Sequence, residues 1–380
     1  MDLAVPAREL INVVTLAQAL IFAGVLLAPR FRNDHANRIL IFSFIVIATV
    51  KIDQLYQLMG GMDVYPSVAF IFTPVQWLLT PSLFFFVIAK VSDNFRFRRS
   101  HLWHLLPATA SFMYLSATYF FLPVDGKIAY IQSGALGEPI NAYFIPLVSD
   151  LIQLGYLLAA QRKLAAYGVT LRNWFSRIDD NDILWVRRVL AIWMVAFLGH
   201  ILLTLSLRVF EWYSFALTVL DALNIAHLLL VNSLLILGVV SHFTPLPSIA
   251  AVDTKGKYAS STQTRDERRD LFKRAQEQMA NNSFFLQMEL TLGEFAESMG
   301  VTSRDLSEAI NGEGGESFYD FVSRYRLEAA QQLLLDEPAA QILDIAHRSG
   351  FNSKSTFNKV FKTVTGQTPS EFRKVTLRTD

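Results

Sequence analysis

The sequence predicts an all-α protein, in which seven membrane-spanning helices precede a smaller helical domain rich in charged residues. Hydrophobic residues make up 52% of the 380 residues and charged residues only 18%, which is apolar for a soluble protein. The charges are also unevenly placed, with 31 in residues 1–240 and 36 in residues 241–380. Charge density therefore doubles near residue 240, and the chain divides there into a membrane part and a soluble part.

Seven apolar stretches in the first part are long enough to cross a membrane, since a spanning helix needs about 20 mostly apolar residues. They lie roughly at Leu10–Ala28, Ile39–Met59, Ser67–Ala89, Leu102–Leu122, Ala142–Ala160, Val189–Val209 and Ser214–Val240. The residues before the first stretch include Asp2, Arg8 and Glu9 rather than a basic cluster. This pattern does not predict a cleaved signal peptide.

Basic residues between the stretches predict the orientation of the membrane part. One set of loops holds 13 Lys and Arg residues, whereas the N-terminal tail and the alternate loops hold only Arg8 and Lys127, with Arg208 at the edge of a stretch. Cytoplasmic loops carry an excess of Lys and Arg. We therefore expect the N-terminus outside and, after seven spans, the chain beyond Val240 in the cytoplasm.

Residues 241–263 contain two Pro residues, small polar residues and no helical apolar stripe, so we interpret them as a flexible linker before a domain at 264–380. A helix is predicted from Thr264 to about Asn281. The net charge of the whole chain is +1, which by itself gives no reason to expect nucleic-acid binding.

The segment TLGEFAESMGVTSRDLSEAIN has the pattern of a helix-turn-helix. Thr291 opens it with a Glu three residues later, which is the spacing of a capping box. Ala296 supplies a small residue where a partner helix approaches, Gly300 supplies the turn, and Leu306 anchors a second helix. A helix-turn-helix requires this order of features.

The same pattern returns fifty residues later in ILDIAHRSGFNSKSTFNKVFK. Ala346 takes the place of the small residue and Gly350 that of the turn. Phe351 follows the turn, and Phe357 and Phe361 start an apolar stripe that continues to Val364. SFYDFVSRYRLEAAQQLLLD predicts one long joining helix between the two motifs. Thr368, Pro369 and Glu371 predict a last short helix, with the Pro at its first position.

With two motifs, a joining helix and the closing GQTPSEFRK, the segment from about Leu271 to Lys374 resembles the AraC/XylS family of bacterial transcription regulators. The matching residues are Tyr325–Leu335, Ile342–Lys362 and Gly366–Lys374. The membrane part is outside the resemblance, although a minority of the family resembles this layout. The resemblance implies promoter DNA as the ligand, with two helices in successive major grooves. It also implies a homodimer on DNA, with RNA polymerase as a further candidate partner.

Helical spacing separates the buried faces of the two recognition helices from faces that can reach DNA. Leu306 and Ile310 point inward in the first helix. The predicted DNA-binding residues are Arg304, Ser307, Glu308 and Asn311 in the first helix and Lys354, Ser355, Asn358, Lys359 and Lys362 in the second. Such side chains read base edges in the major groove, and basic residues hold phosphates.

The charges of the two motifs differ. Residues 289–344 carry three basic against twelve acidic residues, whereas residues 347–378 carry seven basic against one acidic residue. Neutralisation of phosphates supplies much of the affinity for DNA. We therefore expect the second motif to hold the DNA backbone and the first to contribute less.

Ionisable and polar residues within the predicted spans are candidates for sensing a signal, because such residues are costly in a bilayer. They are Lys51, Asp53, Asp150, His200, Asp221, Asn224 and His227. Structural pairing between helices, for instance of Lys51 with Asp221 or Asp150, is the alternative interpretation. An unknown small molecule or membrane signal is the expected ligand.

No enzyme, metal or cofactor motif is found. The chain has no Cys, which excludes thiol nucleophiles and Cys-ligated metals, and HExxH, GxSxG and phosphate-loop motifs are missing. The sequence thus predicts a regulator in the bacterial inner membrane, embedded in the lipid bilayer and binding double-stranded DNA. The alternatives are a transporter or membrane enzyme with a fused DNA-binding domain, and an inert anchor for a constitutive regulator.

Overall fold

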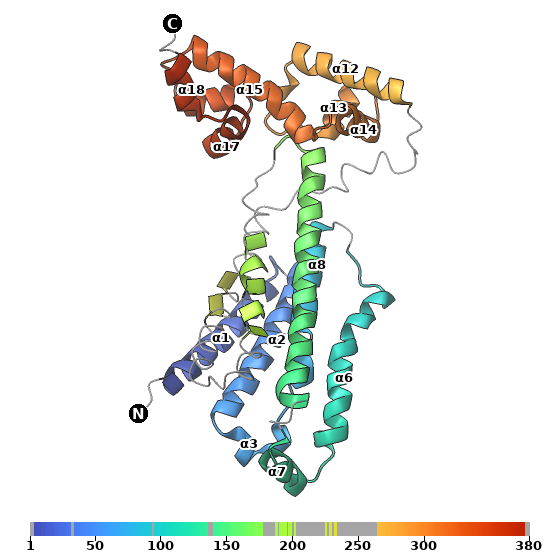
Figure 1. The fold of residues 1–380 in the computed structure, drawn as a ribbon, viewed down its shortest axis with the longest axis vertical. Helices are drawn as coiled ribbons and strands as arrows, with labels where there is room; N and C mark the ends of the chain where they lie inside the picture. The colour runs from blue at the N-terminus through green and yellow to red at the C-terminus, as the bar shows by residue number, and fades with distance from the viewer. Residues whose placement is uncertain are drawn as a thin grey trace. The chain divides into compact units, whose positions relative to one another are not determined.

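The computed structural model describes two long parts of the chain and a few residues between them. The described residues are 4–31, 34–92, 95–135, 140–177, 187–188, 190–195, 197–199, 201–202, 225, 228–229, 232–233 and 264–376. Within them every regular element is a helix (Figure 1), apart from one isolated antiparallel bridge between Phe175 and Thr291. The predicted all-α class is confirmed for this part of the chain.

The chain forms two compact units. One contains Met1–Ala165 and Leu184–Leu246, and the other contains Ala166–Ile183 and Pro247–Asp380. The sequence predicts boundaries at residues 240 and 263, which place residues 166–177 in the membrane part. In the structure these described residues fall in the second unit. The predicted linker, 241–263, lies outside the described residues.

Eight α-helices are described in the N-terminal half of the chain. They are α1 (Ala4–Leu27), α2 (His35–Leu58), α3 (Gly61–Val64), α4 (Thr73–Gln76), α5 (Leu79–Val91), α6 (Leu106–Leu115), α7 (Val124–Gln132) and α8 (Ile145–Trp174). Short 3-10 or π-helical segments lie at Pro66–Val68, Arg99–Leu105, Ser116–Phe120 and Ile140–Phe144. Asp34 begins α2 by accepting a hydrogen bond from the Ala36 amide at 2.8 Å, as a helix N-cap does.

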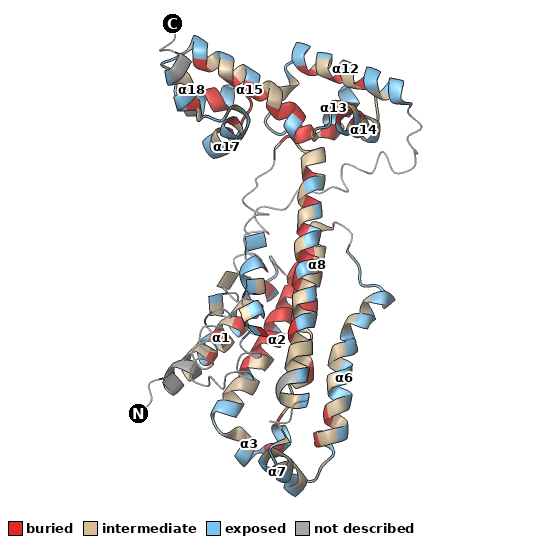
Figure 2. Ribbon diagram, viewed as in Figure 1, coloured by how far each residue is buried: buried red, intermediate tan, exposed pale blue. Residues whose placement is uncertain are grey.

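The core of the first unit is apolar and lies among α1, α2, α5 and the middle of α8. Leu26, Leu40, Phe44, Phe86 and Leu157 are buried there, and Figure 2 marks the buried positions along α2 in red. Many other apolar side chains of these helices remain exposed. An exposed apolar surface of this kind suits a lipid environment.

Three described helical segments are long and apolar enough to cross a membrane, namely Glu9–Leu27, His35–Leu58 and Pro66–Val91. A fourth is obtained if Arg99–Phe120 and Val124–Gln132, which are bent by 103°, are counted as one broken span. The described residues thus support three or four of the seven predicted spans. Helix α8, which contains most of the predicted fifth span, is not among them because polar residues such as Asp150 interrupt its apolar run. The predicted sixth and seventh spans lie largely outside the described residues.

Seven α-helices are described in the C-terminal half. They are α12 (Arg265–Asn281), α13 (Leu292–Ser298), α14 (Ser303–Glu313), α15 (Phe318–Asp336), α16 (Ile342–Arg348), α17 (Lys354–Thr365) and α18 (Pro369–Thr376). Each motif predicted from the sequence is present as a helix pair, α13 with α14 and α16 with α17, and α15 joins them. Side chains of the Ser or Thr residue preceding α12, α13, α14, α15 and α17 cap these helices.

The joining helix α15 contributes to two separate cores. Its first turns place Phe318 and Phe321 in a core with α12, α13 and α14. Its later turns place Leu327 and Leu334 in a core with α16 and α17. The C-terminal domain therefore consists of two helix-turn-helix halves built on one continuous helix.

Candidate nucleic-acid interface

Helix α14 buries the residues predicted to be apolar anchors and exposes a polar face. Leu306 and Ile310 are fully buried. On the polar face Arg304 forms an ion pair with Glu308 at 2.9 Å. The Asn311 amide donates to the Ser307 carbonyl and hydroxyl oxygens at 2.8 and 3.0 Å. The four residues predicted to contact DNA here therefore share one face and pair with one another.

Helix α17 carries a different set of outward residues. Phe357 and Phe361 are fully buried, and α17 itself contains no acidic residue. The predicted DNA-binding residues lie outside this core, with Asn358 half-buried and the others exposed, namely Lys354, Ser355, Lys359 and Lys362. The face of α17 is therefore cationic, as the sequence predicts.

The predicted buried position of Val364 is wrong, because its side chain is 68% exposed. Helix α17 ends one residue later, at Thr365, and is followed by Gly366, which adopts a left-handed conformation with φ of 78°. Phe372 of α18 packs on Phe361 instead, with ring centroids 5.4 Å apart, so the last turn of the apolar stripe extends past the core. Pro369, predicted to begin α18, is buried at its first position.

The turns of the two motifs depend on Gly300 and Gly350, as predicted. Gly300 has φ of 67° and Gly350 has φ of 88°, which is a region that other residues rarely adopt. A Cβ atom at Gly350 would lie 2.4 Å from the Phe285 carbonyl oxygen and 3.0 Å from Nε of Arg326. Space and backbone conformation therefore both require glycine at the second turn, whose neighbours Ala346 and Phe351 are buried.

Arg326, near the middle of α15, connects the two halves and was not singled out in the sequence. It is only 3% exposed. Its guanidinium donates its three shortest hydrogen bonds to backbone carbonyls, those of Phe285 and Gln287 at 2.7 Å each and that of Ser176 at 2.9 Å. It also lies 6.0 Å from the ring centroid of Phe351 in the second motif. Burial lowers the pKa of Arg326 to about 10. The sequence feature that could have identified Arg326 is its position as a cationic residue within the apolar stripe of α15.

The residues that end α8 and follow it pack against the first helix-turn-helix half. Trp174 is partly buried against its core, and the Ser176 amide donates to the Leu290 carbonyl at 3.1 Å. Arg177 forms an ion pair with Glu289. With its amide oxygen turned toward Arg177, Asn352 of the second motif accepts hydrogen bonds from the same guanidinium. Residues 174–177 thus contact both halves.

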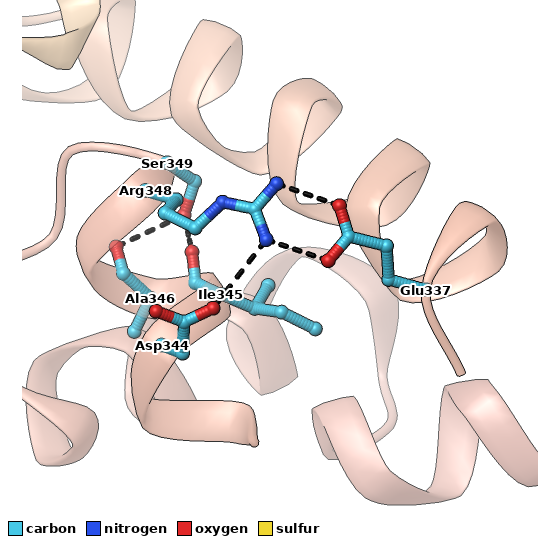
Figure 3. A network of polar contacts seen from close by, with 6 residues as sticks. All are labelled: Glu337, Asp344, Ile345, Ala346, Arg348 and Ser349. Carbon is cyan, nitrogen blue, oxygen red and sulfur yellow. Dashed lines mark hydrogen bonds and ion pairs between the residues drawn. The ribbon is translucent and has the colours of Figure 1, made fainter. Parts of the chain in front are cut away.

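Arg348 holds the second motif to the end of α15 through paired carboxylates (Figure 3). It donates to both carboxylate oxygens of Glu337 at 2.6 Å and to Asp344 at 3.4 Å. These hydrogen bonds lower the pKa of Glu337 and raise that of Arg348. One of the basic residues counted in the second motif is therefore engaged within the protein.

Three of the predicted signal-sensing residues lie in the described part. Lys51 is 1% exposed and donates to the Asn12 and Gln54 amide oxygens at 3.0 and 2.8 Å. Asp53 is half-buried and accepts from the Gln57 amide at 2.8 Å, and Asp150 is buried on α8. The other four, His200, Asp221, Asn224 and His227, lie outside the described residues.

Comparison with known proteins identifies the C-terminal half. Residues 295–375 match a family model described as a helix-turn-helix domain. The transcriptional activator RhrA of Rhizobium meliloti (strain 1021) is 30% identical over 137 residues, 36% of this chain and 41% of the relative. An uncharacterized HTH-type transcriptional regulator of Staphylococcus aureus (strain COL) is 35% identical over 85 residues, 22% of this chain and 11% of the relative. The chain thus spans less than half the length of either relative. No solved structure matches it.

The class that the fold and these matches define is a DNA-binding domain of the helix-turn-helix type. The two motifs on one joining helix give the C-terminal domain the AraC-type arrangement that the sequence predicts. The match does not extend to the apolar helices of the first unit.

Proposed function

We propose that the protein is a membrane-embedded one-component transcriptional regulator. Its C-terminal domain binds promoter DNA sequence-specifically, and its membrane part senses a signal. The observation that carries the proposal is the cationic outer face of α17 on an AraC-type domain. The described part of the chain also contains three helices apolar enough to span a membrane. The expected partners are double-stranded DNA, the lipid bilayer and a second copy of the chain on paired half-sites.

The test is to sequence the DNA bound in cells by the full-length chain and by residues 264–380 alone. We expect both to enrich the same sites, with occupancy by the full-length chain changing between growth conditions. Replacement of Lys354 and Lys362 by Ala supplies the DNA-binding control. If neither form enriches specific promoters, the proposal is wrong. If both behave identically under all conditions, the membrane part is an inert anchor.

The proposed orientation places the N-terminus outside and the C-terminal domain in the cytoplasm of a bacterial cell. The chain contains no Cys, so a single introduced Cys can report its own location. A membrane-impermeant maleimide added to intact cells should label Lys127→Cys but not Arg162→Cys, and should label both after the cells are opened. Labelling in the opposite order would reverse the topology.

Coupling by dimerisation is the route that we favour. The linker that the sequence predicts at residues 241–263 would have an r.m.s. reach of about 26 Å, so a small helix rotation would not be transmitted along it. Dimerisation in the membrane raises the effective concentration on paired DNA sites without such transmission. Replacing 241–263 by a longer Gly/Ser segment should leave the signal response intact. Loss of the response with DNA binding preserved contradicts this route.

A further inference from the structure

A cavity of about 970 Å³ lies in the first unit. It is bounded by the beginning of α2, by α5 and by the segment 95–105. Its walls are mostly apolar and aromatic, and include Ile39, Phe42, Leu78, Phe85 and Leu102. A cavity of this size and lining is typical of a small-molecule site.

Basic side chains complete the lining of this cavity. Arg38 comes from the first turns of α2, and Arg96 and Arg98 come from the segment after α5; all three are exposed. Among the described lining residues none is acidic. Guanidinium groups bind carboxylate and phosphate groups through paired, charge-assisted hydrogen bonds. The cavity therefore combines an apolar wall with sites for an anionic group.

Two imidazoles add directed polar groups to the aromatic wall. His101 and His104 lie against Phe85, with ring centroids 5.0 and 4.9 Å away. The Arg98 backbone amide donates to Nδ1 of His101 at 3.3 Å. A neutral imidazole that accepts at Nδ1 carries its proton on Nε2, so His101 has a second nitrogen that can donate to a ligand.

The position of the cavity along the chain indicates where its ligand comes from. Arg38 lies near the start of the apolar helix His35–Leu58, and Arg96 follows the end of the apolar segment Pro66–Val91. Ends of spanning helices lie at the level of the lipid head groups. Basic pockets between such helices are suited to anionic head groups, whereas the apolar wall suits an acyl chain.

We propose that this cavity binds an anionic amphiphile, with its carboxylate or phosphate at Arg96 and Arg98 and its acyl chain along Phe85 and the apolar wall. This inference rests on the membrane embedding in the proposed function and gives the chemical class of a signal for it. A fatty acid and an anionic phospholipid share this chemistry and are separated by the experiment below.

The experiment measures ligand binding to the purified full-length chain in neutral detergent, without DNA, by native mass spectrometry. Oleate is compared with oleyl alcohol, and dioleoylphosphatidylglycerol with dioleoylphosphatidylcholine, so that each pair shares its acyl chains and differs in net charge. The test variant is Arg96→Ala with Arg98→Ala. The matched control is Arg162→Ala with Lys163→Ala, which removes the same charge from exposed positions of α8 outside the cavity.

We expect one anionic ligand per chain to bind at least about tenfold more tightly than its neutral counterpart, because charge-assisted hydrogen bonds contribute this much. The preference should disappear in the test variant and persist in the control. Excess binding of oleate identifies a single-chain ligand, and excess binding of phosphatidylglycerol alone identifies a phospholipid.

Equal affinity for the charged and neutral members of both pairs overturns the inference. So does an unchanged preference in the test variant. Continued binding of the neutral ligands to the test variant shows that the cavity remains folded. If that binding is lost, Arg96→Lys with Arg98→Lys replaces the test variant, and it must retain the preference for anions. Because DNA is absent, a negative result leaves the proposed regulation of transcription to be judged by its own test.

Discussion

The lysines of α17 offer the sharpest test of how the domain holds DNA. Each phosphate contact contributes about 0.9 to the slope of log K against log salt. At 0.1 M salt, the loss of one such contact weakens DNA binding about eightfold, or by about 1.2 kcal/mol, for each lysine removed. Lys354 and Lys362 are both exposed on a helix without acidic residues. The double Ala variant should therefore bind about 60-fold more weakly, with a slope smaller by about 2.

The matched control removes a neutral pair from α14. Arg304 and Glu308 lie 2.9 Å apart, so Arg304→Ala together with Glu308→Ala leaves the net charge unchanged and should leave the salt slope unchanged. Arg304→Ala alone should weaken binding less than either lysine variant, because it lies in the acidic half of the domain. Gel-shift titrations of the full-length chain at several salt concentrations measure both quantities. A larger effect of Arg304→Ala, or an unchanged slope in the lysine variant, would refute this reasoning.

Three further outcomes test the contacts within the C-terminal unit. Arg326→Met should lower the free energy of unfolding by about 3 kcal/mol, since the Phe285, Gln287 and Ser176 carbonyls lose the buried guanidinium that donates to them. In chemical denaturation the more exposed Arg324→Met should cost less. Phe175→Cys with Thr291→Cys should form a disulfide on oxidation of isolated membranes, because the antiparallel bridge between these residues brings their backbones together. Neither single variant should form this disulfide. The pKa of Glu337 in the folded protein lies below its ordinary value of 4.5. The ion pair of Glu337 therefore contributes fully to stability above pH 4.5, and this contribution is lost as the pH falls through the lowered pKa of the folded state. Glu337→Gln should weaken this pH dependence of the thermal unfolding temperature.

The parts of the fold that were predictable from the sequence rest on local chemistry. Thr291 and its Glu partner form the capping box that their spacing predicts. Gly300 and Gly350 adopt the positive φ that a tight turn requires, and the apolar spacing of α17 identified Phe357 correctly. The prediction that Val364 is buried was wrong because apolar periodicity does not reveal where a core ends.

The parts that were not predictable depend on contacts between distant residues. Arg326 and Ser176 are 150 positions apart, and no local pattern links them. The cavity likewise combines Arg38 with the segment near Arg98, which the sequence showed only as basic loops. Charge counting by segment also misses pairing, because Arg348 was counted toward a basic surface although it binds two carboxylates.

Pairing changes what the charge of each motif means for DNA. In the first motif Arg304 pairs with Glu308 and Arg324 with Glu316 at 2.9 Å each, and Arg326 is buried. Its three cations are thus engaged within the protein, and its outward face offers neutral groups such as Asn311, which suit base edges better than phosphates. In the second motif Arg348 is engaged in the same way, and Arg373 of α18 donates to the Pro338 carbonyl at 3.0 Å. Among the described residues, the cations that can reach the DNA backbone are therefore mainly the lysines of α17. We therefore expect base substitutions under α14 to change specificity with little effect on the salt slope, and variants of α17 to change the slope for every sequence.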